Sequence, residues 1–127
     1  MTAVSYTATG RAAIVDIIDN TSATPSYWFG WGTGGSSTLS TATTTDVALQ
    51  AEATESRILT SNSQPDTVTN QFVATITAGT GKVIEEFGLF TASTSGSIII
   101  RATQGGITLA TGDSIQATFQ LAQTAGT

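Results

Sequence analysis

The sequence predicts an all-β protein: one antiparallel β-sandwich, jelly-roll-like, with at most one short helix. Residues 68–78 and 114–121 alternate between apolar and polar side chains. This alternation is typical of strands that bury one face, because successive side chains point to opposite sides of a strand. Turn-forming residues recur about every 8–12 residues, which gives about seven or eight strands. An immunoglobulin-like strand arrangement is the alternative to the jelly roll.

Three strands are expected in the first part of the chain. Residues 2–9 are rich in β-branched residues, and residues 26–32 hold both tryptophans in an alternating pattern. Residues 11–18 contain three isoleucines and a valine. These favour a strand, although their spacing also fits one face of a helix. The polar residues 19–25 are predicted to form a loop.

The middle of the chain contains the best helix candidate. Residues 33–45 are rich in glycine, serine and threonine, and are predicted to form a loop. Residues 46–55 contain alanine, leucine, glutamine and glutamate, which are strong helix formers, and Thr45 or Asp46 is suited to cap them. We therefore predict the one short helix here, followed by a short strand within residues 56–61.

Residues 62–66 are polar and include Pro65, which has no backbone N–H to donate, so they are predicted to form a loop. The alternating strand 68–78 comes next. It ends in the sequence Ala-Gly-Thr-Gly at residues 78–81, which is typical of a turn. This turn leads the chain into its most strongly patterned part.

The last third of the chain predicts three adjacent antiparallel strands. Two apolar runs, Lys82–Phe90 and residues 97–102, are joined by the small polar residues 91–96, as in a hairpin. Turn residues at 110–113 then precede the alternating strand 114–121.

Bulky residues at inward-facing positions of these strands predict the core. Gly88, inside an otherwise apolar strand, indicates a bulge or a close approach of backbone. The predicted core residues are Phe72, Ile76, Ile115, Phe119 and at least one of Phe87 and Leu89.

Composition excludes several classes of function. The chain has no cysteine and no histidine, so it lacks disulfides, thiolate metal sites and the commonest general base. Its four basic residues are scattered and its net charge is −5, which argues against nucleic-acid binding. It has no secretory signal and no apolar run long enough to span a membrane. We therefore expect a single domain over residues 1–127 that is not an enzyme and binds no cofactor or metal.

Three groups of residues are candidates for a binding or catalytic site. Trp28 and Trp31 fit a sugar-binding platform, but large aromatic residues more often fill a core. Residues 16–20 contain oxygen ligands for calcium but lack the spacing of a calcium loop, so a turn is the better interpretation. Glu85 and Glu86 are adjacent in a strand and point to opposite faces. They cannot form one acid–base pair, and one of them is expected to face an arginine such as Arg101 across strands.

Several short motifs occur in a familiar order over about residues 11–121. They resemble those of small structural proteins of tailed-bacteriophage virions, which include capsid decoration (cement) proteins and tail-fibre proteins. The motifs are, in chain order, residues 27–34 (YWFGWGTG), 49–57 (LQAEATESR), 72–77 (FVATIT), 84–93 (IEEFGLFTAS) and 109–115 (LATGDSI).

The resemblance implies a protein without catalytic residues, made in the host cytoplasm and bound to the outer capsid surface of the virion. It implies a homotrimer that binds the major capsid protein and stabilises the shell. The alternative is a tail-fibre or tail-tip module that binds host-surface glycan. Residues 1–9 and 120–127 are expected to be exposed arms that pair with another chain. The candidate interaction residues are Thr2, Ala3, Val4, Ser5, Tyr6, Trp28 and Trp31.

Overall fold

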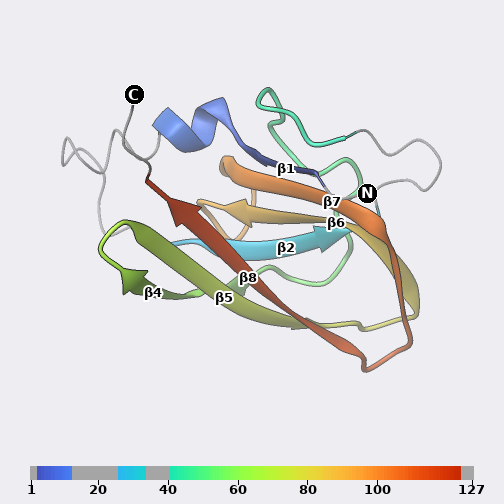
Figure 1. Cartoon of the computed structure of the whole chain (residues 1–127). Helices are drawn as coiled ribbons and strands as arrows, with labels where there is room; N and C mark the ends of the chain where they lie inside the picture. Colours follow the sequence, from blue (N-terminus) through green and yellow to red (C-terminus); the bar gives the residue numbers. More distant parts are fainter. Residues whose placement is uncertain (1–2, 13–25, 34–40, 124–127) are drawn as a thin grey trace.

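A computed structural model of the chain describes residues 3–12, 26–33 and 41–123, which form two antiparallel β-sheets packed face to face (Figure 1). One sheet has the strand order β1-β7-β6-β2-β3, and the other has the order β4-β5-β8. The predicted all-β sandwich is confirmed, whereas its jelly-roll connectivity stays a prediction. In chain order the strands are β1 (Ala3–Tyr6), β2 (Trp28–Gly32), β3 (Ile58–Leu59), β4 (Ser61–Asp66), β5 (Thr69–Thr77), β6 (Lys82–Phe90), β7 (Ile98–Leu109) and β8 (Ser114–Ala122).

The main apolar core lies between the two sheets. The ring centroid of Phe29 on β2 lies 6.1 Å from that of Phe87 in its own sheet and 5.7 Å from that of Phe119 in the other. Aromatic side chains dominate the energetics of such a core because each buries a large apolar area. The predicted core residues Phe72, Ile76, Phe87, Leu89 and Phe119 are all buried, and Ile115 packs partly buried against them.

The alternating sequences set the register of the smaller sheet. β5 and β8 pair without a register shift along their length. Phe72 lies opposite Phe119, and Ile76 lies opposite Ile115. Because residues two apart share a face, these pairs all point toward the core.

The prediction of three adjacent strands in the last third is wrong for the third of them. β6 and β7 pair through the loop at residues 91–96 as expected, but β8 pairs with β5 in the other sheet. The turn at residues 110–113 is tied to the end of β5. Ala78 donates its N–H to the Asp113 carbonyl oxygen (2.7 Å) and accepts a hydrogen bond from the Gly112 N–H (2.8 Å). These hydrogen bonds hold the turn beside the end of β5, so the strand that follows the turn, β8, pairs with β5 in the smaller sheet.

The helix seen in the described residues lies in a different place from the predicted one. Residues 8–12 are helical, and Thr7 caps them by accepting a hydrogen bond from the Gly10 N–H at 3.0 Å. Residues 46–55 are irregular, because contacts with the sheet override their helix propensity. The start of the predicted strand 11–18 is thus helical, and the rest of it lies outside the described residues. No helix in the described ranges is long and apolar enough to cross a membrane.

The predicted loop at residues 62–66 is wrong, because these residues belong to β4. Pro65 is compatible with a strand here because β4 is at the edge of its sheet, where a missing N–H interrupts no inner ladder. The pairing with β5 also shifts register between Ser63 and Asp66. The short strand expected within residues 56–61 is confirmed by β3.

Most of the described residues of both predicted arms belong to sheets of their own chain, and residues 8 and 9 belong to the short helix. β1 pairs with β7 along its whole length, so its residues gain their order without a second chain. Thr7 continues this attachment by donating its hydroxyl to the Ile98 carbonyl oxygen at 2.6 Å. Residues 120–122 likewise belong to β8. The expectation of free arms is therefore corrected for these residues.

Candidate functional site

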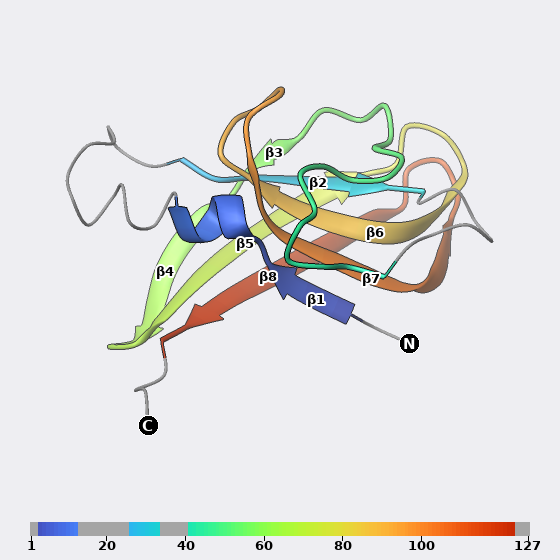
Figure 2. The same ribbon diagram turned by 90° about the horizontal axis from the view of Figure 1, so that it is seen from above.

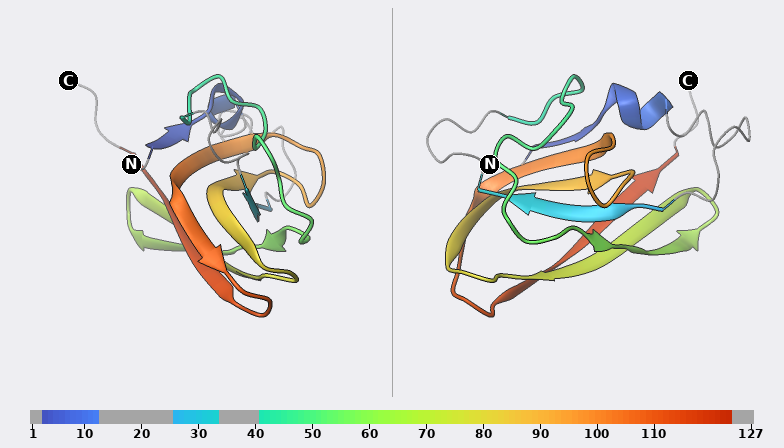
Figure 3. Two further views of the ribbon diagram at one scale, coloured as in Figure 1. Left: turned by 90° about the vertical axis from the view of Figure 1, so that its right-hand side faces the viewer. Right: turned by 180° about the vertical axis from the view of Figure 1, so that it is seen from behind.

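Residues 41–57, which we call the strap, cross the face of the five-stranded sheet that points away from the smaller sheet (Figures 2 and 3). The strap lies against the end of β2, where Ala53 donates its N–H to the Trp31 carbonyl oxygen at 3.0 Å. Gly32 permits this contact, because a Cβ atom at that position would clash with the Ala51 carbonyl oxygen. The strap therefore covers the sheet closely although it is not itself a strand.

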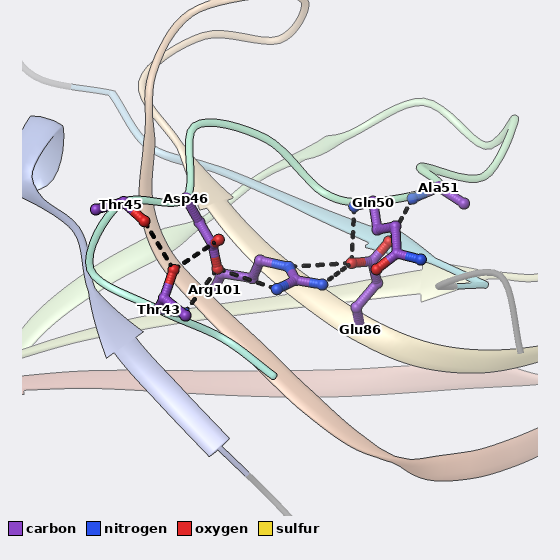
Figure 4. A network of polar contacts seen from close by, with 7 residues as sticks. All are labelled: Thr43, Thr45, Asp46, Gln50, Ala51, Glu86 and Arg101. Atoms are coloured by element: carbon purple, nitrogen blue, oxygen red, sulfur yellow. Dashed lines mark hydrogen bonds and ion pairs between the residues drawn. The ribbon is translucent and has the colours of Figure 1, made fainter. Parts of the chain in front are cut away.

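A buried ion pair lies beneath the strap, between Arg101 of β7 and Glu86 of β6 (Figure 4). Arg101 Nη2 and Nε lie 2.8 and 3.1 Å from Glu86 Oε2, and the two side chains are 2% and 0% exposed. The backbone N–H groups of Gln50 and Ala51 donate to the same carboxylate at 2.9 and 2.7 Å. Glu86 thus accepts the backbone donors that a neighbouring strand would otherwise bind. The prediction that Glu85 or Glu86 faces Arg101 is confirmed for Glu86.

Asp46 adds a second carboxylate to Arg101. Its Oδ2 lies 3.0 Å from Arg101 Nη1 and accepts the Thr43 N–H at 2.8 Å, while its Oδ1 accepts the Thr43 hydroxyl at 2.9 Å. Partial burial acts to raise the pKa of Asp46, but the hydrogen bonds from Thr43 and Arg101 outweigh it and hold the pKa below its ordinary value. Asp46 is therefore charged at neutral pH and holds one end of the strap.

Glu55 holds the other part of the strap through three donors. Trp31 Nε1 and the Gly79 N–H each donate to its carboxylate at 3.0 Å, and Lys82 forms an ion pair with it. Burial acts to raise the pKa of Glu55, but the bonds from Lys82, Trp31 and Gly79 outweigh it and lower the pKa to about 2. The indole N–H of Trp31 is therefore used inside the protein.

Arg57 fixes the end of the strap. Its guanidinium makes two hydrogen bonds of 2.8 Å with Glu52, donates to two carbonyl oxygens of the loop at residues 91–96, and lies 3.5 Å above the centre of the Phe90 ring. Arginine makes such contacts better than lysine does, because its guanidinium is planar, stacks on aromatic rings and binds a carboxylate through two parallel hydrogen bonds. Gly88 leaves space for this ring, since a Cβ atom there would lie 2.7 Å from it. The close backbone approach predicted at Gly88 is therefore corrected, because the atoms that a Cβ there would meet belong to the side chains of Phe90 and Ile98.

The strap network is suited to holding backbone in place. Every buried side-chain nitrogen and oxygen of the described residues has a hydrogen-bond partner. The described ranges contain no group of three or more acidic side chains placed to hold a metal ion. The charged groups of the network bind one another and the backbone of the strap.

An apolar cleft of about 410 Å³ lies between the sheets, away from the strap. β1 and β7 line one wall and β8 lines the other, and none of the lining side chains is charged. Val4 contributes to the lining although 63% of its surface is exposed. The cleft is thus an apolar surface that the described residues leave uncovered. Its apolar walls include Val4, Phe87, Ile100, Ile107, Ala117 and Phe119.

The four edge strands of the two sheets differ in their protection against pairing with another chain. β3 is two residues long, and β4 carries Pro65, Asp66 and a register shift, which are all features that discourage edge pairing. β1 and β8 carry no charge, no proline and no register shift. Both border the cleft. We call β1, β8 and the cleft the open side.

Fold and site together define a β-sandwich with a charge network that is paired internally and one uncharged open side. Comparison with protein-family models, curated proteins and solved structures gave no significant match. The strap and the open side are therefore the features of the molecule that bear on its function.

The predicted interaction residues fall into two separate groups. Those of β1 lie at the open side, whereas Trp28 and Trp31 lie on β2, with β6 and β7 in between. Trp31 is 1% exposed and belongs to the core, and Trp28 is half-buried on the opposite face. Thr2 lies outside the described residues, as do residues 16–20. The residues of the first group in β1 are Ala3, Val4, Ser5 and Tyr6.

Sequence reasoning missed the cleft wall formed by β8. Ile115 and Phe119 were assigned to the core, but they also line the cleft. The available signal was the absence of charge and proline along residues 114–122, since edge strands usually carry such residues. That signal is informative only once the strand is known to lie at an edge.

Proposed function

We propose that this protein is a capsid decoration (cement) protein of a tailed bacteriophage. It binds the major capsid protein on the outer surface of the virion, stabilises the shell and catalyses no reaction. The open side carries this proposal, because two strand edges without protective features flank an uncharged apolar cleft in the described residues, as expected of a protein that acts in an assembly of copies on a shell. Such edges bind partners by adding a strand, which supplies backbone hydrogen bonds without charged side chains.

The motifs that resemble virion proteins support the proposal through the strap. Residues 49–57 form the strap's second half, residues 84–93 contain Glu86, and residues 27–34 contain Trp31. All three motifs meet where the strap is held against the sheet. The resembling residues are therefore those that build this sandwich, and they supply no catalytic group.

Attachment in many copies makes weak contacts sufficient for this role. One backbone hydrogen bond contributes only about 0.5–1.5 kcal/mol net. The copies of a homotrimer bind together, however, so the second and third contacts form at high effective concentration. A shell held at many such points resists the outward pressure of packaged DNA.

A tail module that binds host glycan has less support. A sugar platform needs an exposed ring, but Trp31 is 1% exposed and donates its N–H to Glu55. Trp28 packs half-buried against Leu49, Phe90 and Ile98. Neither ring is placed as a free stacking surface.

The test is to mix the purified protein with purified capsids and, separately, with purified tails of the phage that encodes it. We expect the protein to sediment with capsids at a fixed number of copies per particle. Capsids without it should release their DNA at a lower temperature. Host polysaccharide, added as a competitor, should leave both binding and tryptophan fluorescence unchanged. Binding only to tails, or to neither particle, would contradict the proposal.

A further inference from the structure

We infer that copies of this protein pair with one another through the open side, so that the β1 edge of one copy adds to the β8 edge of the next. This deepens the proposed function, on which it rests, by naming the surface that joins the trimer. The first observation is the sheet order, which places β1 and β8 at ends of their sheets, each with one neighbour strand. Within the part of the chain that the structure describes, no strand pairs with the second edge of either.

The second observation is the contrast among the four edges. β3 and β4 carry protective features, and β1 and β8 carry none. Soluble proteins protect exposed edges against unwanted pairing. Two unprotected edges beside one apolar cleft are therefore better explained by a partner that covers them than by chance exposure.

The third observation is charge, which favours a second copy as the occupant. The chain has a net charge of −5, so copies repel one another wherever acidic surfaces meet. The lining of the cleft is free of charge, and β1 and β8 contain no charged residue. A strongly basic partner would find no carboxylate on this surface, whereas an uncharged edge of the same chain meets no repulsion there.

The size of the surface favours a closed ring. A stable interface buries roughly 800 Å² on each partner, which a strand of four residues cannot supply alone. In a ring, each copy gives β1 to one neighbour and receives another β1 on β8, so the cleft walls are buried as well. Such head-to-tail contacts close into rings when the rotation between copies permits. We expect three copies in the ring.

Cysteine cross-linking tests the pairing directly, because the chain has no native cysteine. Val4 lines the cleft, so Ser5 points to the other face of β1. The exposed positions on the matching face of β8 are residues 114, 116, 118, 120 and 122, of which Gln116, Thr118 and Gln120 are the central three. Ser5→Cys should be mixed in turn with Gln116→Cys, Thr118→Cys and Gln120→Cys under oxidising conditions. Facing cysteines on paired strands lie within disulfide range.

We expect one of these mixtures to form a covalent dimer of the two variants, while Ser5→Cys alone stays uncoupled. Efficient coupling of Ser5→Cys to itself would indicate β1–β1 pairing and overturn the inference. Failure of all three mixtures to couple would overturn it as well.

A matched pair of charge variants provides the second test. Val4→Lys places a charge on the β1 edge, and Val47→Lys makes the same change on the strap, where Val47 is 70% exposed. Both positions are exposed, so both variants should fold. In analytical ultracentrifugation we expect a trimer for the unaltered chain, self-association weakened at least about tenfold for Val4→Lys, and no change for Val47→Lys. Equal effects of both variants would overturn the inference.

Capsid binding of the unaltered chain separates this inference from the proposed function. A chain that is monomeric at every concentration but still binds capsids would overturn the pairing and leave the proposed function in place. A trimer joined through β1 and β8 that binds no capsid would overturn the proposed function alone.

Discussion

The strap and the open side differ in what binds their backbone hydrogen-bonding groups. Both contain backbone N–H and carbonyl groups that the pairing of strands within the two sheets does not bind. In the strap these groups are bound by side chains, such as the Glu86 carboxylate that accepts two backbone N–H groups. At the open side, β1 and β8 each have one edge that pairs with none of the described strands. The charged side chains of the network hold the strap, whereas β1, β8 and the cleft lining contain no charged residue.

This difference shows which part of the molecule is held in a single arrangement. A buried ion pair gains little net free energy over a well-packed apolar pair, but breaking it is costly. Arg101, Glu86 and Asp46 therefore act mainly to hold the strap in one arrangement. The open side has no comparable constraint, so it is free to accept another chain.

The largest expected effect is at the strap. Arg101→Ala would leave Glu86 charged, buried and without its cation, which should lower the free energy of unfolding by about 3–5 kcal/mol. Urea denaturation measures this change. The control is Arg11→Ala, because Arg11 lies at the exposed surface, where its guanidinium donates to the Tyr6 carbonyl oxygen. A loss below about 1 kcal/mol for Arg101→Ala would mean that the strap does not depend on the ion pair.

An intermediate effect is expected from acid. The pKa of Glu55 is about 2 in the folded protein, below its ordinary value of 4.5. Its contribution is therefore complete above pH 4.5 and is lost as the pH falls toward 2. The free energy of unfolding should fall by roughly 2–3 kcal/mol more in this window than it does for Glu55→Gln. Chemical denaturation at several pH values measures the difference, and parallel curves for the two proteins would contradict the assignment.

The smallest effect is expected at the open side. Thr118→Lys changes an exposed residue of β8, so it should alter the stability of the isolated monomer by no more than about 0.5 kcal/mol. Denaturation at low protein concentration measures the monomer, since association adds stability that depends on concentration. A loss of several kcal/mol there would show that the open side is as constrained as the strap, and the comparison would fail.

Local patterns in the sequence predicted most of the sandwich. The alternation in β5 and β8 identified both strands and the faces of Phe72 and Phe119, because a period of two depends only on the strand itself. The cross-strand partner of Arg101 was also anticipated from the opposite orientation of two adjacent glutamates. These predictions needed no knowledge of which strands are neighbours beyond one hairpin.

The features that failed depend on distant contacts. Residues 46–55 have the composition of a helix, but Glu86 and Trp31 bind their backbone and hold it against the sheet. Closeness in sequence predicts that β8 lies beside β7. In the structure, hydrogen bonds with Ala78 hold the connecting turn beside the end of β5. Pro65 indicated a loop because the edge position of β4 was unknown. The open side was missed for the same reason.

The pairing of β1 with β7 also has a consequence for biosynthesis. Ala3 lies opposite Thr103, so β1 emerges from the ribosome about 100 residues before its partner. At a synthesis rate of roughly 5–20 residues per second, this interval lasts on the order of 5–20 s. During that time β7, the partner of β1 in the folded chain, has not yet been synthesised. The five-stranded sheet therefore gains this edge strand only after most of the chain has been made.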